Sequence, residues 1–480
     1  MGIRTGAQYL ANLRDDREVW IHGERVADVT THPGMRRGPH TLAGFLDKQF
    51  DPALRDLLTY EEDGERVAMS FLTPKSPEDV RRRGAAYYEW ATWSNGMLGR
   101  TPDYKNASIM AFGSAAAYLG QGRADFAANM VAYYEEVRKG DKVLTHTLVN
   151  PQISFDLAKE GKYSGKVALQ IVRETDAGVI VNGARLLATL GPFADEIEVF
   201  PSTLLKASDE NLPFAIAFAL PVNTPGLRLI CRDTYDHGKS HFDAPLASRY
   251  EEMDAVVIFE NVLVPWERVF MYRDPALCNR AFSETNAVLH MMHQVAAGKL
   301  AKAEFAVGLL CAMARATGKD KDMAVKGQIA EAMWIAESVR AFLYSAEHQA
   351  EPDQWGNYAP LRRPLDTSRN MFPKLYPRLV ELVQLLGSSS LMATPSEADF
   401  SNGLAGDVER YFQVENLNSH DRVALFRLAH DFSVSGFGGR QTLYERFFFG
   451  PQNILASVYY DLYDKDDMVG RVEDLLNKVD

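Results

Sequence analysis

The chain has 480 residues, of which 46% are hydrophobic and 24% charged, and its formal net charge is −12. This length predicts about two to four packed units, and the acidic balance argues against binding to nucleic acid or to an anionic membrane. The longest apolar run is far below the ~18 residues that a spanning helix needs, and the first residues lack the pattern of a signal peptide, so we expect a cytoplasmic protein that is not inserted in a membrane.

Residues 1–142 are predicted to be mostly helical. Ser76-Pro77-Glu78-Asp79 has the pattern of a helix start, with a hydroxyl cap, a proline in the first turn and acids near the positive end. Thr101-Pro102-Asp103 repeats this pattern, with Thr101 as the expected cap. The stretch from Ala111 to Arg138 indicates one or two further helices.

Residues 143–272 change to a β-rich pattern. Val167–Val172 and Val179–Val181 are predicted strands joined by a turn at Asp176-Ala177-Gly178. Glu196–Phe200 alternates between acidic and apolar residues, which predicts a half-buried strand. Further β-rich runs cover residues 214–220, 227–231 and 255–259. Because no helical pattern separates these runs, we expect an antiparallel sheet or barrel and no βαβ nucleotide-binding unit.

Residues 273–480 return to helix. Two apolar stripes follow helical spacing, one formed by Leu300, Ala303, Val307, Leu310 and Ala314 and the other by Ile329, Met333, Ala336, Val339 and Leu343. Residues 375–392 and 423–435 are further candidate helices, and helices of this kind in succession indicate a bundle. The predicted fold class is therefore α+β, mostly α, with units at 1–142, 143–272 and 273–480.

Several motif searches fail in an informative way. Gly238-Lys239-Ser240 ends like a phosphate-binding loop, but Asp233 stands where that loop requires a glycine. Gly436-Phe437-Gly438-Gly439 follows a predicted helix and no strand, so it is not a dinucleotide fingerprint, although it could cap that helix. The three cysteines lack CxxC spacing, and the histidine pairs lack a third ligand, so no metal site is predicted.

Five groups of residues, in order along the chain, carry a resemblance to a known family. They are GRTPDY at 99–104, THTLVNPQ at 145–152, GARLLAT at 183–189 with FPST at 200–203, FENVLVPWERV at 259–269, and FGGRQTLYER at 437–446. Together they resemble the oxygenase component of the 4-hydroxyphenylacetate 3-monooxygenase family, whose members are two-component flavin-dependent aromatic hydroxylases.

The resemblance implies an acyl-CoA dehydrogenase-like fold: N-terminal helices, a middle antiparallel β-domain and a C-terminal four-helix bundle that assembles a homotetramer. It also implies that FAD arrives reduced, as FADH2, from a separate NAD(P)H:flavin reductase. With O2 as co-substrate, the reduced flavin would form a C4a-hydroperoxide that hydroxylates a phenol at the ortho carbon. The lack of a dinucleotide fingerprint agrees with this division between two proteins.

The resemblance assigns the substrate hydroxyl to Arg100, Tyr104 and His146. A phenol, with a pKa near 10, is mostly neutral at pH 7, and cationic or donor groups at its oxygen favour the more reactive phenolate. Arg100 precedes the helix that Thr101-Pro102 opens, and Tyr104 lies in its first turn, so both can point into one pocket. Ser202 and Thr203 are expected to bind the substrate's tail.

The same resemblance assigns two sets of residues to the flavin. The isoalloxazine ring would contact His146, Thr147, Leu148, Val149, Gln152, Ile153, Ser154, Phe155 and Thr189. The phosphate or adenine end would lie near Gly438, Gly439, Arg440 and Gln441, because glycines permit close backbone approach and an arginine can pair with a phosphate.

Two alternatives to a phenol hydroxylase remain open, of which the first is an acyl-CoA-acting flavoprotein of dehydrogenase or dehydratase type. An acyl-CoA-acting flavoprotein of dehydrogenase type would need a catalytic carboxylate in the bundle, which the sequence does not place. A dehydratase of the same superfamily would need cysteines for an iron–sulfur cluster, and residues 97–104 contain none, while Lys299 stands after His293 where a thiolate is required. A non-catalytic flavin-binding protein is the other alternative. The sequence also leaves open which phenol is accepted.

Overall fold

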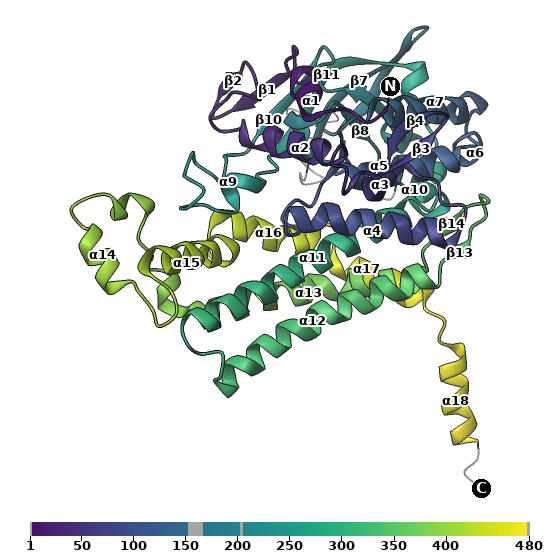
Figure 1. Ribbon diagram of the computed structural model, residues 1–480. Coiled ribbons are helices and arrows are strands. Elements are labelled where there is room, and N and C mark those ends of the chain that lie inside the picture. Colours follow the sequence, from purple (N-terminus) through teal and green to yellow (C-terminus); the bar gives the residue numbers. More distant parts are fainter. Residues whose placement is uncertain (1, 152–166, 202–204, 478–480) are drawn as a thin grey trace.

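The computed structural model describes residues 2–151, 167–201 and 205–477. It consists of a β-rich half and a bundle of long helices, with N-terminal helices between them (Figure 1). The helices of the N-terminal stretch are α1 (Gly6–Asn12), α2 (Arg37–Lys48), α3 (Arg55–Leu58), α4 (Pro77–Trp93), α5 (Pro102–Ser114), α6 (Ala116–Leu119) and α7 (Ala124–Gly140).

The helix starts that were predicted in this stretch lie at the expected residues. Ser76 caps α4, because its hydroxyl accepts a hydrogen bond from the backbone N–H of Asp79. Thr101 precedes α5 as expected, but the prediction that its side chain caps the helix is wrong. The Thr101 hydroxyl accepts a hydrogen bond from Gln294 of the bundle at 3.2 Å, so it joins α5 to a neighbouring helix.

The N-terminal stretch also contributes strands, which the helical prediction omitted. They are β1 (Glu18–Ile21), β2 (Glu24–Val26), β3 (Thr59–Glu62) and β4 (Glu65–Ala68). A two-residue turn joins β1 to β2, in which His22 and Gly23 have φ angles of 53° and 79°. Such left-handed pairs match the twist of a hairpin, so this turn is the local signal that could have identified the strands.

Two sheets form the middle stretch. Its strands are β5 (Leu144–Thr147), β6 (Gln170–Thr175), β7 (Gly178–Thr189), β8 (Glu196–Val199), β9 (Ile216–Pro221), β10 (Leu227–Cys231), β11 (Asp254–Pro265) and β12 (Val269–Tyr272), with a short helix α9 (Ala247–Tyr250) before β11. One sheet has the order β2-β1-β10-β11-β7-β6 and the other β12-β9-β8-β5. Most neighbours are antiparallel as predicted, but β1–β10 and β5–β8 are parallel.

Residues 196–199 form the predicted strand β8, but the prediction that this strand is half-buried is wrong. All four residues of β8 are buried, including Glu196 and Glu198. Both carboxylates are retained inside because each meets a cation: Lys142 and Arg268 pair with Glu196, and Lys105 pairs with Glu198. Alternation of polar and apolar residues therefore does not mean solvent exposure where the polar side chains are ion-paired.

Long helices form the C-terminal stretch. They are α10 (Pro275–Glu284), α11 (Ala287–Ala316), α12 (Met323–His348), α13 (Arg362–Gly387), α14 (Ala405–Tyr411), α15 (Ser419–Ser433), α16 (Gly436–Phe447), α17 (Gln452–Leu462) and α18 (Asp466–Leu476), with a small hairpin of β13 (Glu351–Pro352) and β14 (Tyr358–Ala359). Helices α11, α12, α13 and α15 form the predicted four-helix bundle, and α4 and α5 pack on α11. One stripe residue is misplaced: Met333 is 43% exposed.

Candidate active site

The three residues predicted to hold the substrate hydroxyl lie together where α5 meets the edge strand β5. Tyr104 lies in the first turn of α5, Arg100 just before it, and His146 on β5. The Tyr104 and His146 rings meet edge to face, with centroids 5.8 Å apart. The guanidinium carbon of Arg100 lies 4.3 Å from the centroid of the Tyr104 ring. Arg100, Tyr104 and His146 therefore border one small region.

The guanidinium of Arg100 has donors that lack acceptors. It is stacked between Tyr104 and Phe448, whose ring centroid is 4.2 Å from the guanidinium carbon. Its Nε and Nη1 are buried and have no hydrogen-bond partner within the described residues. Leaving such donors unsatisfied costs free energy, which an added acceptor would recover. Burial lowers the pKa of Arg100, but Tyr104, Tyr444 and Glu252 raise it further, so the group remains a cation.

Tyr104 and His146 are both held neutral. Burial raises the pKa of Tyr104 although the Arg100 charge opposes this, so its hydroxyl keeps its proton at pH 7. Burial, together with the charges of Lys105 and Arg100, lowers the pKa of His146 well below its usual value. A cation, a phenol and a neutral imidazole therefore surround one position, which is the set of donors that an aromatic hydroxyl or phenolate oxygen requires.

The described residues assigned to the flavin ring lie at the adjoining ends of β5 and β7. The Thr145 hydroxyl donates to the backbone carbonyl of Thr189 at 2.5 Å, which joins the two strands. Thr147 is buried, and its Oγ1 has no hydrogen-bond partner among the residues that the structure describes. After β5, the backbone carbonyls of Leu148 and Val149 accept hydrogen bonds from the Arg185 side chain and the Leu186 N–H. Gln152, Ile153, Ser154, Phe155, Ser202 and Thr203 lie outside the described residues.

Arg440 was predicted to bind a phosphate, but its guanidinium is already paired with two carboxylates. Its Nε and Nη2 lie 3.0 and 2.8 Å from the two carboxylate oxygens of Asp254, and its Nη1 contacts Glu252. The Thr189 hydroxyl donates to Asp254 at 2.7 Å, and Glu252 accepts from the backbone N–H of Arg100 at 2.7 Å. This network connects Thr189, Arg100 and Arg440, which come from three stretches that the sequence analysis assigned to the site.

Glu252 and Asp254 belong to this network around the candidate site, and the sequence analysis did not name them. Together with Glu251 they form an acidic run at the start of β11, of which Asp254 is the first residue. That run was the available signal, because acids that become buried must be paired with cations from elsewhere in the fold. Arg232 is such a cation as well, since it pairs with both Glu251 and Asp254.

The glycine-rich segment begins α16, so the alternative that it caps the end of a helix is wrong. The Ser435 hydroxyl is the N-cap and accepts a hydrogen bond from the Gly438 N–H at 3.2 Å. A Cβ on Gly438 would lie 2.5 Å from the Phe432 carbonyl oxygen, whereas Gly439 has open space. Gln441 is buried, where it donates to the Met97 carbonyl and accepts from Lys302. The segment thus attaches α16 to the loop that carries Arg100.

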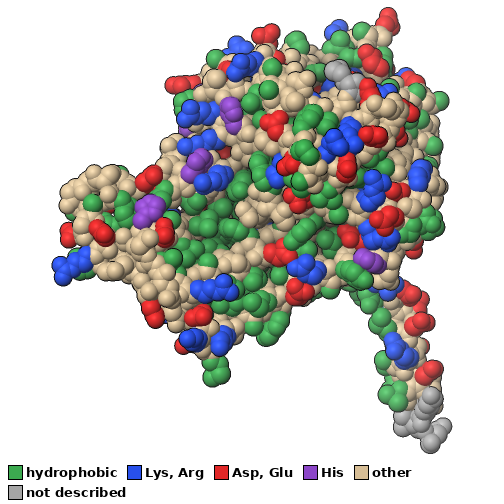
Figure 2. All heavy atoms as spheres, viewed as in Figure 1, with side chains coloured by type: hydrophobic (Ala, Val, Ile, Leu, Met, Phe, Trp, Pro, Cys, Tyr) green, Lys and Arg blue, Asp and Glu red, His purple; other side chains and the backbone are tan. Residues whose placement is uncertain are grey.

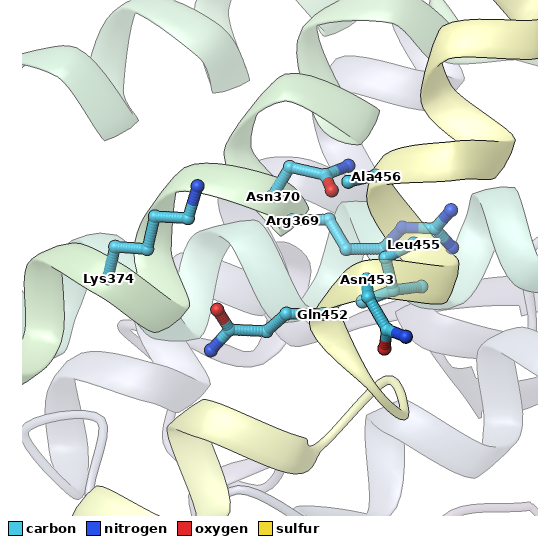
Figure 3. A pocket seen from close by; sticks show the side chains of 7 residues that line it. All are labelled: Arg369, Asn370, Lys374, Gln452, Asn453, Leu455 and Ala456. Atoms are coloured by element: carbon cyan, nitrogen blue, oxygen red, sulfur yellow. The ribbon is translucent and has the colours of Figure 1, made fainter.

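The other features of the described residues provide no second candidate active site. No group of three or more His, Cys, Asp or Glu side chains that could hold a metal occurs in the described part of the chain. Cys231 and Cys278 are buried and Cys311 is partly buried, and all three are free thiols. A hollow of about 200 Å³ lies between α13 and α17, and none of the predicted site residues lines it (Figure 3). Among the described helices, none has the length and apolar character needed to cross a membrane.

Comparison with family models gives two matches that together cover most of the chain. The N-terminal model of 4-hydroxyphenylacetate 3-hydroxylase matches residues 5–271, and the C-terminal model matches residues 278–477. The 4-hydroxyphenylacetate 3-monooxygenase oxygenase component of Thermus thermophilus is 45% identical over 99% of this chain and 98% of that protein. The 4-nitrophenol 2-monooxygenase oxygenase component of a Rhodococcus species is 32% identical over 92% of this chain and 85% of that protein.

Solved structures agree with these family matches. A crystal structure of the oxygenase component of 4-hydroxyphenylacetate 3-monooxygenase, complexed with FAD and 4-hydroxyphenylacetate, matches with a TM-score of 0.94 and 45% identity over 99% of this chain and 98% of that one. A 4-hydroxybutyryl-CoA dehydratase from N. maritimus matches with a TM-score of 0.89 at 17% identity, covering 100% of this chain and 96% of that one, and shares the fold. The fold predicted from the sequence is confirmed.

Proposed function

The chain belongs to the 4-hydroxyphenylacetate 3-hydroxylase family, and on that premise we propose how it acts on its substrate. It is the oxygenase component of a flavin-dependent aromatic monooxygenase, which uses FADH2 and O2 to hydroxylate a phenol at the ortho carbon. A separate reductase supplies the reduced flavin. The reaction takes place in the cytoplasm, where NAD(P)H is available to that reductase.

One observation carries the assignment of the substrate hydroxyl. Arg100 presents buried donors that have no acceptor within the described residues, beside the ring of Tyr104, which in turn meets the ring of His146. A phenol oxygen placed there would accept from all three, and the permanent charge of Arg100 would favour the phenolate. Negative charge on the oxygen increases electron density at the ortho carbon, which is the carbon that is hydroxylated.

The residues present also fit a flavin. Thr147 offers a buried hydroxyl that lacks a partner within the described ranges, and it lies on β5, whose Thr145 hydroxyl donates to the Thr189 carbonyl at the end of β7. Such neutral groups suit the carbonyls and nitrogens of an isoalloxazine ring. When bound, the reduced flavin reacts with dioxygen to supply the electrophilic oxygen atom. Because the guanidinium of Arg440 is paired with both Glu252 and Asp254, we assign Arg440 to holding α16 against β11. Gly438, Gly439 and Gln441 would form the backbone surface nearby.

A homotetramer is the proposed assembly. Helix α18 projects from the body of the chain and carries hydrophobic side chains along its length (Figures 1 and 2). Met468, Val469, Val472, Leu475 and Leu476 are 44–70% exposed and follow the spacing of one helix face. A second copy of the chain is the occupant we propose for this face, because an isolated projecting helix of eleven residues is marginal in water. Sedimentation of the full chain and of a truncation after Asp464 tests this.

The experiment that tests the function combines the purified chain with a flavin reductase, NADH, FAD and a panel of phenols that includes 4-hydroxyphenylacetate and 4-nitrophenol. We expect a catechol product whose new oxygen comes from ¹⁸O-labelled O2, and no NADH oxidation by the chain alone. Failure of every phenol, together with bleaching of bound oxidised FAD by an acyl-CoA, would favour the acyl-CoA alternative. At present only the shared fold supports that alternative.

A further inference from the structure

A buried ion pair lies directly behind His146. The Nζ of Lys105 is 2.7 Å from Oε2 of Glu198 and 3.3 Å from Nδ1 of His146. The two charged side chains are 3% and 0% exposed. His146 and Glu198 are direct partners in the parallel pair of β5 and β8, so their side chains stand side by side on one face of the sheet. Lys105 reaches both from α5.

Stability alone does not account for this pair. Removing two charges from water costs several kcal/mol per ion, and apolar residues of similar size are often equally stable in such a position. The neighbouring buried acid, Glu196, has a different arrangement, because its partners Lys142 and Arg268 are 25% and 19% exposed. Lys105, by contrast, is enclosed, and its contacts with polar side chains are those with Glu198 and His146 within the described residues.

We propose that Lys105 and Glu198 are positioning residues that hold His146 in the tautomer with its proton on Nε2, so that this nitrogen donates to the substrate oxygen. The proposal rests on the proposed function. A lysine ammonium has donors and no acceptor, so it requires a lone pair on Nδ1, and the neutral ring must then carry its proton on Nε2. His146 is therefore a donor that stabilises the phenolate, and it does not accept the phenol's proton.

The role of Glu198 is to keep Lys105 charged. Burial raises the pKa of Glu198 to about 7 and lowers that of Lys105, while the attraction between the two charges opposes both shifts. The other groups that face this cluster are Arg100 and Tyr104 on the substrate side, and Tyr133 and Glu196, with Lys142 and Arg268, on the other side. A neutral Lys105 would have a lone pair that accepts a hydrogen bond from Nδ1–H, so a lone pair on Nδ1 would no longer be required and the other tautomer of His146 would become available.

The test measures the ionisation of a bound phenol directly. 4-Nitrophenol is the probe, because its phenolate is yellow, and its apparent pKa on the protein is read from absorbance against pH. In Lys105→Met we expect this pKa to rise by about one, a tenfold loss of bound phenolate at a given pH, because a hydrogen bond to a charged oxygen is lost. In the coupled assay kcat is expected to fall about tenfold, with a smaller change in KM.

Glu198→Gln removes the charge that keeps Lys105 protonated, so Lys105 is expected to lose its proton at a lower pH. The weakening of phenolate binding is therefore expected to grow as the pH rises. Lys142→Met is the matched control, because it breaks the neighbouring buried pair without touching His146, and the pKa of bound 4-nitrophenol should not change. Lys105→Met/Glu198→Leu removes both charges, so it is expected to fold with nearly unchanged thermal stability and to retain the raised pKa of the bound phenol.

Three results would overturn the inference: an unchanged pKa of bound 4-nitrophenol in Lys105→Met, an equal shift in Lys142→Met, or failure of both the single and the double variant to fold. The last would assign the pair to the core. These results differ from failure of the proposed function, in which the wild-type chain itself neither binds nor hydroxylates any phenol.

Discussion

Replacing Arg100 by alanine removes the charge that is expected to stabilise the substrate as a phenolate. The backbone N–H of residue 100 would still donate to Glu252, so the loop before α5 keeps its attachment to the segment that precedes β11. The side chain contributes stacking on Tyr104 and Phe448 and the two buried donors that have no acceptor in the described structure. The change therefore acts on the substrate more than on the fold.

The magnitude follows from the kind of bond that is lost. A hydrogen bond to a charged group contributes about 1.5–3 kcal/mol, and loss of one donor that stabilises a developing oxyanion costs about 10²–10³-fold in kcat. We therefore expect Arg100→Ala to reduce kcat/KM at least about 10²-fold, or ~2.7 kcal/mol. Arg100→Lys is expected to recover little, because an ammonium cannot reproduce the planar, stacked guanidinium.

The assay is the reductase-coupled hydroxylation of 4-hydroxyphenylacetate, or of whichever phenol in the panel turns over fastest, with thermal unfolding measured in parallel. Arg123→Ala is the matched control. Arg123 is likewise stacked on two aromatic rings, Phe126 and Trp266, each 4.7 Å away, but it is remote from the predicted site residues and pairs with Asp125. Wild-type turnover in Arg100→Ala, or an equal loss in Arg123→Ala, would refute the reasoning.

Four further predictions concern the other parts of the site. Tyr104→Phe removes one neutral hydrogen-bond donor, worth about 0.5–1.5 kcal/mol, so the KM for the phenol is expected to rise. More of the consumed O2 is expected to appear as hydrogen peroxide, which is measured with peroxidase. An unchanged ratio of hydroxylated product to consumed O2 would contradict this. Thr189→Ala is expected to weaken FAD binding in fluorescence titration without changing the phenol's KM, and the opposite pattern would reverse the two roles. Arg440→Ala leaves Asp254 and Glu252 buried with fewer cations, so chemical denaturation should show a loss of about 3–5 kcal/mol. Burial raises the pKa of the Asp254 carboxyl, but Arg440 and Arg232 lower it by more, so the pKa lies below its ordinary value. The stability that this ionised carboxylate contributes is therefore complete above pH about 4 and is lost as the pH falls further. A free energy of unfolding that does not change in this acid range would contradict the prediction.

The sequence predicted the fold well where the signals were local. Caps, prolines and apolar spacing identified α4, α5, α11 and α12, since each of these signals acts within one or two turns of helix. The strands β1 and β2 were missed because they complete a sheet whose other members are more than 140 residues away, with β1 pairing with β10. Long-range pairing of this kind leaves little trace in a window of neighbouring residues.

The candidate site was predicted in part. Arg100, Tyr104 and His146 came from family resemblance, and the structure brings them together. Apart from the acidic run that contains Glu252 and Asp254, their supporting residues could not be predicted, because a buried carboxylate in sequence looks like an exposed one. Glu198 illustrates this: its alternating pattern predicted a face in water, whereas Lys105, on a helix more than 90 residues earlier, neutralises it inside the protein.

The distribution of charge around the candidate site supports the proposal that Arg100 binds the substrate oxygen. The buried cationic side chains of this region include Arg100, Lys105, Lys302 and Arg440. Three of them have a carboxylate partner, since Lys105 pairs with Glu198, Lys302 with Glu445, and Arg440 with Glu252 and Asp254. The side chain of Arg100 has no such ion pair within the described residues, and its nearest neighbours are aromatic faces. Because an unpaired buried cation favours an anion more strongly than a paired one, the negative charge of a phenolate is best stabilised at Arg100, and the other three cations hold the surrounding elements in place.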